Sequence, residues 1–266
     1  MKQKLIALDL DGTTLNRQGK VSQRTKETLS KVTQLGHRVI LATGRSFQIS
    51  KHIYKELGLN TPMVNFNSGL VHLPYEEWDK ERVVGLDLDV VDDIIKRSEN
   101  RPEVSLLTVE SKDYFWVNKV ANPDIDFFPR TVTEEDLLPN SYPQEIISVM
   151  LFSEDPDDLA KEIKTAYPNL SMHVWKGHIK GIEILSKKVH KADGVFYVAD
   201  QFNISNDDII AFGDEENDYE MLQSVGLGVA MANASSHLKE IAKDVTELTN
   251  DEDGVARYLE DYFKLN

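Results

Sequence analysis

The sequence predicts an α/β protein in which a parallel-sheet domain is interrupted by a second, α+β domain. Both ends of the 266-residue chain alternate short apolar runs with helix-like segments, which is the pattern of βαβ units. The middle differs, because it holds seven of the nine prolines and strand-like runs that suit an antiparallel sheet. We therefore expect a discontinuous α/β domain at 1–83 and 186–266, and an α+β domain at 84–185.

The first α/β segment is expected to contain three buried strands and two helices. We expect strands at 5–8, 38–42 and 63–66, and helices at 25–34 and 46–57. Ser22 is a good N-cap for the first helix, because its hydroxyl can accept a backbone N–H of the first turn. Gly36 and Gly58 are typical of the residues that end helices. Each strand leads directly into a polar cluster.

The middle segment combines helical and strand-like runs without a βα alternation. Its expected helices lie at 87–98 and 157–166, and its expected strands at 114–117, 146–152 and 171–175. No run in it is typical of a sugar, nucleotide or cofactor site, so the sequence leaves the substrate open. It also leaves the oligomeric state open.

The βα alternation returns in the last third of the chain. Strands are expected at 208–212 and 226–231, and helices at 190–202, 219–222, 235–243 and 253–262. This segment and the first one together form the interrupted α/β domain.

Composition limits the classes of partner. The formal charge of −15 argues against a nucleic-acid backbone or an anionic membrane as partner, so a small anionic substrate would need a metal ion or a few local cations. The chain has no cysteine, which excludes thiol catalysis, disulfides and Cys-zinc sites. No run is long enough to be a signal-peptide core or to span a bilayer, and we expect a soluble cytoplasmic protein.

Polar clusters follow three of the expected strands. They are Asp9 with Asp11, Thr43 with Gly44, and Asp214 with Asn217 and Asp218. Because the carboxyl ends of parallel strands share one edge of a sheet, these clusters should converge. Carboxylates gathered in one place repel each other, and a hard cation with oxygen ligands relieves the repulsion. The sequence therefore predicts a Mg²⁺ site, and zinc is disfavoured because the clusters contain no histidine.

These residue types suit phosphoryl transfer to a carboxylate. Asp9 could attack phosphorus, and Asp11 could protonate the leaving oxygen and later deprotonate water. Thr43 and Gly44 offer a hydroxyl and a bare amide to the phosphoryl oxygens. Lys191, at the start of an expected helix, is the best-placed cation for the developing charge, with Lys187 and Lys188 as rivals.

The same residues resemble the four ordered motifs of the haloacid dehalogenase superfamily. The matching segments are Asp9-Leu10-Asp11-Gly12-Thr13, Leu41-Ala42-Thr43-Gly44-Arg45, Lys191, and Gly213-Asp214-Glu215-Glu216-Asn217-Asp218. Segments around Gly228 and Gly254 further resemble the Cof-type subfamily. Glu215 and Ala192 stand where that subfamily often has glycine, which leaves the catalytic atoms intact.

The resemblance implies a Mg²⁺-dependent phosphatase with a Rossmann-like core and an inserted α+β cap of the C2B type. It implies that Asp9 is the nucleophile and Asp11 the acid/base, and that a small-molecule phosphate ester is the substrate. The implied metal set is the Asp9 carboxylate, the Asp11 backbone carbonyl, Asp214 and Asp218, the last bound directly or through the surrounding shell. The implied phosphate-binding set is Leu10, Thr43, Gly44, Lys191 and Asn217.

Three other interpretations remain at this stage. A phosphosugar mutase would use the same aspartyl-phosphate, but such mutases resemble proteins with a small helical cap between the first two motifs. A regulator that only binds Mg²⁺ or phosphate would not need Asp11, and a dehalogenase would not need it either. Single residues also have simpler readings: Thr43 as a helix cap, Asp218 as a helix N-terminal acid, and Arg45 as a surface or inter-domain residue.

Overall fold

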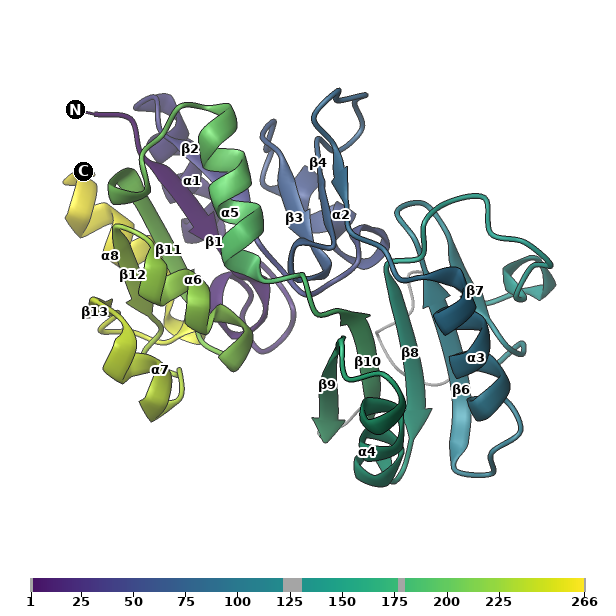
Figure 1. The fold of residues 1–266 in the computed structure, drawn as a ribbon. Helices are drawn as coiled ribbons and strands as arrows, with labels where there is room; N and C mark the ends of the chain where they lie inside the picture. The colour runs from purple at the N-terminus through teal and green to yellow at the C-terminus, as the bar shows by residue number, and fades with distance from the viewer. Residues whose placement is uncertain (1, 122–130, 177–179, 266) are drawn as a thin grey trace. The chain divides into compact units, whose positions relative to one another are not determined.

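The protein, described here from a computed structural model, consists of two compact units (Figure 1). The structure describes residues 2–121, 131–176 and 180–265. The first unit comprises Met1–Arg45, Ser50–Arg82 and His190–Asn266, and the second comprises Ser46–Ile49 and Val83–Val189. The first unit contains a parallel sheet with helices, and the second an antiparallel sheet with helices. The predicted α/β fold class is therefore confirmed.

The first unit is built on a five-stranded parallel sheet in the order β13-β12-β11-β1-β2. Its strands are β1 (Leu5–Leu8), β2 (Arg38–Leu41), β11 (Ile209–Gly213), β12 (Leu227–Ala230) and β13 (Asp244–Val245). All four side chains of β1 are fully buried, as the apolar run predicts for a central strand. β1 pairs in parallel with β2 on one side and with β11 on the other, so the three strands end at one edge.

Six α-helices lie wholly or mostly within the described residues of this unit. They are α1 (Gln23–Gln34), α2 (Phe47–Glu56), α5 (Lys191–Gln201), α6 (Tyr219–Ser224), α7 (Ser236–Ile241) and α8 (Gly254–Phe263). The Ser22 hydroxyl accepts the Thr25 backbone N–H at the start of α1, as the sequence predicts. None of the helices in the described part of the chain has both the length and the apolar surface that a bilayer crossing needs.

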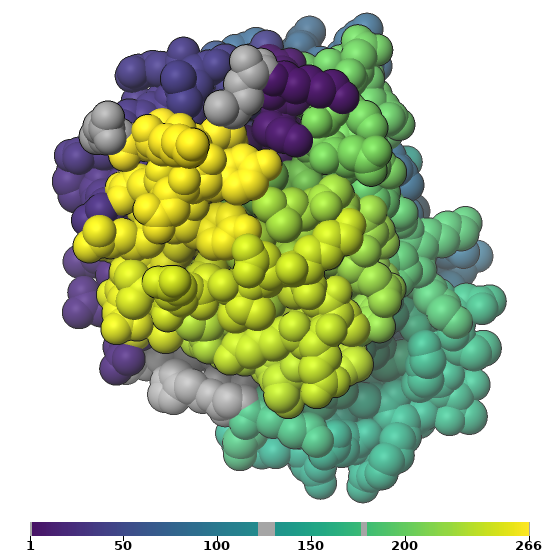
Figure 2. All heavy atoms as spheres, turned by 90° about the vertical axis from the view of Figure 1, so that its left-hand side faces the viewer, coloured from purple at the N-terminus to yellow at the C-terminus, as the bar shows by residue number. Residues whose placement is uncertain are grey.

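The two ends of the chain meet within the first unit. Figure 2 shows the yellow C-terminal helix α8 beside the purple N-terminal segment. The Arg24 guanidinium in α1 donates to the Glu260 carboxylate in α8, with Nε 3.0 Å from Oε1. The rings of His37 and Phe263 lie 4.5 Å apart between centroids. α8 therefore packs against α1 in the first unit.

One strand departs from the expected parallel arrangement. β3 (Met63–Asn65) is joined to the parallel sheet by an isolated parallel bridge between Ala42 and Val64 and is not one of the sheet's five strands. It belongs instead to a small sheet with β4 (Leu70–His72) and β5 (Arg82–Val83), two strands that were not expected. The chain reverses between β3 and β4 because three residues after Asn65 adopt left-handed backbone conformations.

The second unit contains a five-stranded sheet in the order β7-β6-β8-β10-β9, and every strand pair in it is antiparallel. Its elements are β6 (Val104–Glu110), β7 (Phe115–Val117), β8 (Ser148–Ser153), β9 (Leu170–Lys176), β10 (Lys180–Ser186), α3 (Leu88–Ser98) and α4 (Pro156–Ala166). Apolar residues of both helices and the sheet form one core, which includes Ile94 of α3, Leu151 of β8 and Ile163 of α4. The helices and three of the strands were predicted, whereas β6 and β10 were not.

Candidate active site

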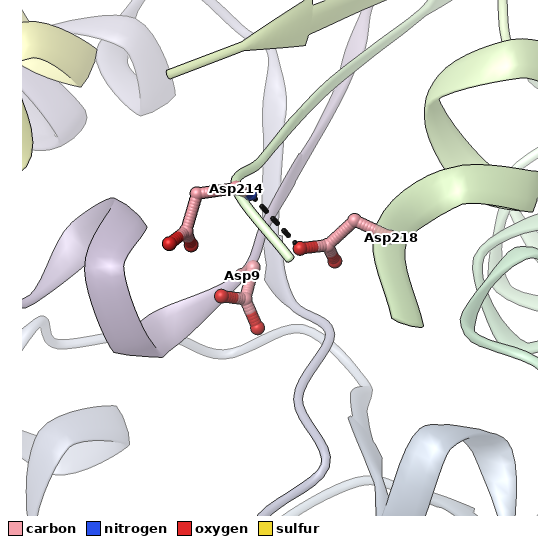
Figure 3. Close-up of side chains that lie close together, drawn as sticks. All are labelled: Asp9, Asp214 and Asp218. Atoms are coloured by element: carbon pink, nitrogen blue, oxygen red, sulfur yellow. Dashed lines mark hydrogen bonds between the residues drawn. The ribbon is translucent and has the colours of Figure 1, made fainter. Parts of the chain in front are cut away.

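Three aspartates from two strand ends meet in the first unit (Figure 3). Asp9 follows β1 and Asp214 follows β11, while Asp218 lies in the turn before α6. Each offers a carboxylate oxygen, and these oxygens lie within 4.8 Å of one another. Leu8 pairs with Phe212 in the parallel ladder, which places the residues after both strands side by side. The predicted convergence of Asp9 and Asp214 is therefore a feature of the structure.

Lys191 joins this cluster from the first residue of α5. Its Nζ donates to Asp9 Oδ1 at 2.6 Å and to Asp218 Oδ1 at 2.7 Å, and its side chain is 1% exposed. The rival lysines, Lys187 and Lys188, are both exposed. Burial alone would lower the pKa of Lys191, but the carboxylates of Asp218 and Asp9 outweigh burial and raise it. Lys191 is therefore a buried amine whose charged form the two carboxylates stabilise.

The carboxylates outnumber the cations in this cluster. Burial raises the pKa of Asp9 well above its ordinary value, with the charge of Asp218 adding to the effect and Lys191 opposing it. Burial also raises the pKa of Asp214 to about 7, against a hydrogen bond from Thr13 that lowers it. Three acids beside one ammonium leave negative charge uncompensated. The oxygen-only donor set and this excess of negative charge fit Mg²⁺.

Both carboxylate oxygens of Asp218 accept hydrogen bonds from the protein. Its Oδ2 accepts the backbone N–H groups of Asp214 at 3.0 Å and Glu215 at 3.2 Å, and its Oδ1 accepts Lys191. A Cβ at Gly213 would lie 2.4 Å from Asp218 Cγ, so the close approach requires glycine there. Asp218 thus orients both Lys191 and the backbone that carries Asp214.

The turn after β1 supports Asp214 directly. Gly12 has a φ of +70°, and a Cβ on it would lie 2.1 Å from Asp214 Oδ2. Thr13 Oγ1 donates to Asp214 Oδ1 at 2.8 Å. Asn233, beyond the end of β12, donates to the Gly12 carbonyl at 2.7 Å. Thr13 and Asn233 were not predicted as site residues, although Asn233 follows a strand end like the predicted ones.

Asp11 lies outside the buried cluster and is held by Arg45. Arg45 Nε donates to Asp11 Oδ2 at 2.7 Å and Nη2 donates to Oδ1 at 2.6 Å, a bidentate pair. The Asp11 side chain is 59% exposed, so it can reach other partners when the pair opens. The sequence suggested a surface or inter-domain role for Arg45, and the structure shows its side chain, 27% exposed, paired with Asp11.

The predicted phosphate-binding residues lie after the ends of β1, β2 and β11 and at the start of α5. Leu10 directly follows Asp9, and buried Thr43 accepts the Arg45 backbone N–H on its Oγ1 at 3.1 Å. A Cβ at Gly44 would lie 3.6 Å from Asn217 Nδ2, so these two motifs are adjacent. Asn217 Nδ2 donates to Asn67 Oδ1 at 3.1 Å. Asn67 was not predicted as a site residue, because its position depends on the reversal after β3.

Comparisons with known proteins cover nearly the whole chain. The family model of the haloacid dehalogenase-like hydrolases matches residues 6–259. The 5-amino-6-(5-phospho-D-ribitylamino)uracil phosphatase YitU of Bacillus subtilis is 36% identical over 273 residues, covering 99% of this chain and 99% of that protein. YcsE of the same organism has the same named activity and is 26% identical over 257 residues, covering 96% of this chain and 94% of that protein. The solved structure of a haloacid dehalogenase-like hydrolase from B. subtilis superimposes with a TM-score of 0.78 at 26% identity, covering 97% and 99% of the two chains.

Proposed function

Because this chain belongs to the haloacid dehalogenase-like hydrolase family, we propose that it hydrolyses a small phosphorylated metabolite with Mg²⁺ through an aspartyl-phosphate intermediate. The resemblance seen in the sequence is confirmed, as is the enzyme class of phosphoric monoester hydrolase. The observation that carries the proposal is the contact of buried Asp9 with Lys191, beside Asp214 at a sheet edge.

In the first step, Asp9 attacks the phosphorus of the ester. A carboxylate oxygen of Asp9 forms the new bond while the bond from phosphorus to the alcohol oxygen breaks. Asp11 gives a proton to the departing oxygen. Lys191 holds Asp9 Oδ1 at 2.6 Å, which fixes the carboxylate and leaves Oδ2 for the attack.

In the second step, water attacks the phosphorus of the aspartyl-phosphate. Asp11, now a carboxylate, takes a proton from this water, and the bond from Asp9 to phosphorus breaks. Asp9 returns as a carboxylate and inorganic phosphate leaves. The two steps use the same pair of aspartates in alternating protonation states.

Asp9, Asp214 and the Asp11 backbone carbonyl are the groups that would hold Mg²⁺. The bound ion would supply positive charge that offsets the carboxylates and the phosphoryl oxygens. Since Asp218 already accepts from Lys191 and two backbone N–H groups, we assign it to the support of this site. The phosphoryl oxygens are assigned to the groups predicted from the sequence: Leu10 N–H, Thr43, Gly44, Lys191 and Asn217.

Asp11 must leave Arg45 before it can act on the leaving group. Both of its carboxylate oxygens accept from the guanidinium in this conformation. A carboxylate held in a bidentate pair cannot also carry and donate a proton. The conformation described here is therefore a resting one, and opening of the pair belongs to the catalytic cycle.

The first substrate to test is 5-amino-6-(5-phospho-D-ribitylamino)uracil. Two relatives carry this activity in their names, and one of them aligns with the chain from end to end. We assign residues 84–185 to a cap domain that sets specificity, because the predicted phosphate-binding residues all lie outside them. The mutase is disfavoured because the chain between β1 and β2 contains only the short helical turn Leu10–Thr14 and one α-helix, α1, with no inserted domain.

The direct test is phosphate release by the purified protein. We expect hydrolysis of p-nitrophenyl phosphate and of the ribityl compound with Mg²⁺, and loss of both reactions with EDTA. Asp9→Asn should abolish activity, whereas Asp251→Asn, which removes a surface carboxylate paired with Arg17, should not. Failure of the wild-type protein to release phosphate from any ester, or unchanged turnover in Asp9→Asn, would refute the proposal.

A further inference from the structure

The turn between β3 and β4 has an unusual backbone. Phe66, Asn67 and Ser68 have φ values of 51°, 53° and 85°, and none of the three is glycine. L-residues disfavour this left-handed region because Cβ approaches the carbonyl oxygen. Such conformations persist where surrounding contacts impose them, and they concentrate at functional sites. The turn therefore calls for an explanation in terms of what it holds in place.

The turn is fastened to the loop that follows β2. The Phe66 N–H donates to the Arg45 carbonyl at 3.2 Å, and the Asn67 N–H donates to the Thr43 carbonyl at 3.1 Å. This loop carries Thr43 and Gly44, two of the proposed phosphate-binding residues. The turn and the proposed phosphate loop are thus one hydrogen-bonded unit.

The same turn supports the helix that begins at Lys191. A Cβ added to Gly194 in α5 would lie 2.9 Å from Ser68 Cβ and 2.5 Å from Val64 Cγ1. Ser68 is fully buried in this contact. Glycine at 194 therefore lets the first turns of α5 lie directly on the strained turn, which ties Lys191 to the same unit.

We propose that Asn67 is a positioning residue that orients Asn217 for the phosphoryl group, an inference that rests on the proposed phosphatase function. Asn67 Oδ1 accepts from Asn217 Nδ2 at 3.1 Å. Asn67 Oδ1 determines which end of the Asn217 carboxamide faces it, because a flipped Asn217 amide would place Asn217 Oδ1 against Asn67 Oδ1. The same Nδ2 carries a second N–H, which is then directed to a phosphoryl oxygen.

The choice of residue at 67 supports this role. Glycine adopts a φ of 53° without strain, so backbone stability alone would favour glycine there. Asparagine tolerates the left-handed region better than most other residues and adds a carboxamide. A Cβ at Gly44 would lie 3.4 Å from Asn67 Oδ1 and 3.6 Å from Asn217 Nδ2, so both amides border the proposed phosphate loop. The side chain, and not the turn geometry, is the reason for asparagine.

The test compares Asn67→Gly with Asn217→Ala and with the double variant. Asn67→Gly keeps the backbone relaxed and removes only the carboxamide. We expect it to retain the melting temperature of the wild type, to lower kcat/KM for p-nitrophenyl phosphate about 10-fold, and to weaken inhibition by orthophosphate similarly. The double variant should be no worse than Asn217→Ala, because Asn67 acts through Asn217. Asn203→Gly is the matched control, since exposed Asn203 has the same φ of 53° and lies outside the site.

The outcomes separate the two proposals. Wild-type protein that neither hydrolyses a phosphate ester nor binds orthophosphate would overturn both. An active wild type with unchanged kcat/KM and orthophosphate inhibition in Asn67→Gly would overturn only the positioning role. Losses that multiply in the double variant would also overturn it, since independent residues give additive free energies.

Discussion

Replacing Asp218 by asparagine tests whether the buried charge cluster holds the site together. Asp218 is fully buried and accepts three hydrogen bonds, from Lys191 and from the backbone N–H groups of Asp214 and Glu215. Asparagine has one carboxamide oxygen, so its NH₂ group must face either the ammonium or the two N–H groups. Either orientation places donors against donors.

The size of the effect follows from these contacts. Breaking a buried ion pair by removing one partner costs about 3–5 kcal/mol of unfolding free energy. The lower end applies, because Lys191 keeps its contact with Asp9 at 2.6 Å. About 3 kcal/mol corresponds to a fall in melting temperature of roughly 6–12 °C for a domain of about 150–250 residues.

The assay is calorimetric melting of wild type, Asp218→Asn and a surface control. Asp251→Asn removes a carboxylate whose partner Arg17 is 84% exposed, and such surface pairs contribute little to stability. Asp218→Asn should also lose turnover, since Lys191 and Asp214 would shift. A melting temperature no lower than that of the control would refute the proposed role of the cluster.

Three further predictions concern the turn at Gly12, two buried glutamates of the second unit, and the binding of Mg²⁺. Gly12→Ala should lower kcat by about 100-fold, because the added Cβ would displace Asp214. Gly19→Ala is the control: it has the same left-handed strain, but its Cβ would meet no atom within 4 Å, so this variant should stay active. Equal activities of the two variants would contradict this prediction. Burial raises the pKa of Glu110 to about 7 and that of Glu183 to about 8, the latter with help from the charge of Glu110. The folded protein therefore binds more protons than the unfolded chain between pH 4.5, the ordinary pKa of these groups, and about pH 8. The urea-unfolding free energy should fall as pH rises across this range and become level above it. Glu110→Gln should make that slope shallower by up to about 1.4 kcal/mol per pH unit, and an unchanged slope would contradict the burial effect. Mg²⁺ should raise the melting temperature of the wild type and leave that of Asp214→Asn nearly unchanged, and equal shifts would place the ion elsewhere.

Much of the first unit could be predicted from local signals. The apolar run at Leu5–Leu8 identifies a buried strand, and parallel strands bring their carboxyl ends together, which is why Asp9 and Asp214 could be paired from the sequence. The start of α1 was predictable for a similar reason, because Ser22 is a local capping signal.

The unpredicted features depend on contacts between distant residues. The reversal after β3 requires positive φ at Phe66, Asn67 and Ser68. None of these residues is glycine, so the sequence does not indicate the left-handed conformation. β6 and β10 each contain a glutamate, Glu110 or Glu183, whose pKa burial raises. In the sequence these residues count as charged, so the two segments do not resemble buried strands. Lys191 was chosen over Lys187 and Lys188 for its place at the start of an expected helix, and its burial, which the sequence does not show, separates it from those two exposed lysines.

Asp9 is the group that becomes phosphorylated in the proposed mechanism. The decisive measurement is mass spectrometry of Asp11→Asn protein quenched in acid after mixing with p-nitrophenyl phosphate and Mg²⁺. This ester needs no proton for its leaving group, so the first step should proceed while the second, which needs Asp11, is slowed. We predict a phosphoryl group on Asp9 that hydroxylamine removes. Turnover by the wild type with no phosphorylated peptide in the variant, or with the label on another residue, would contradict the mechanism.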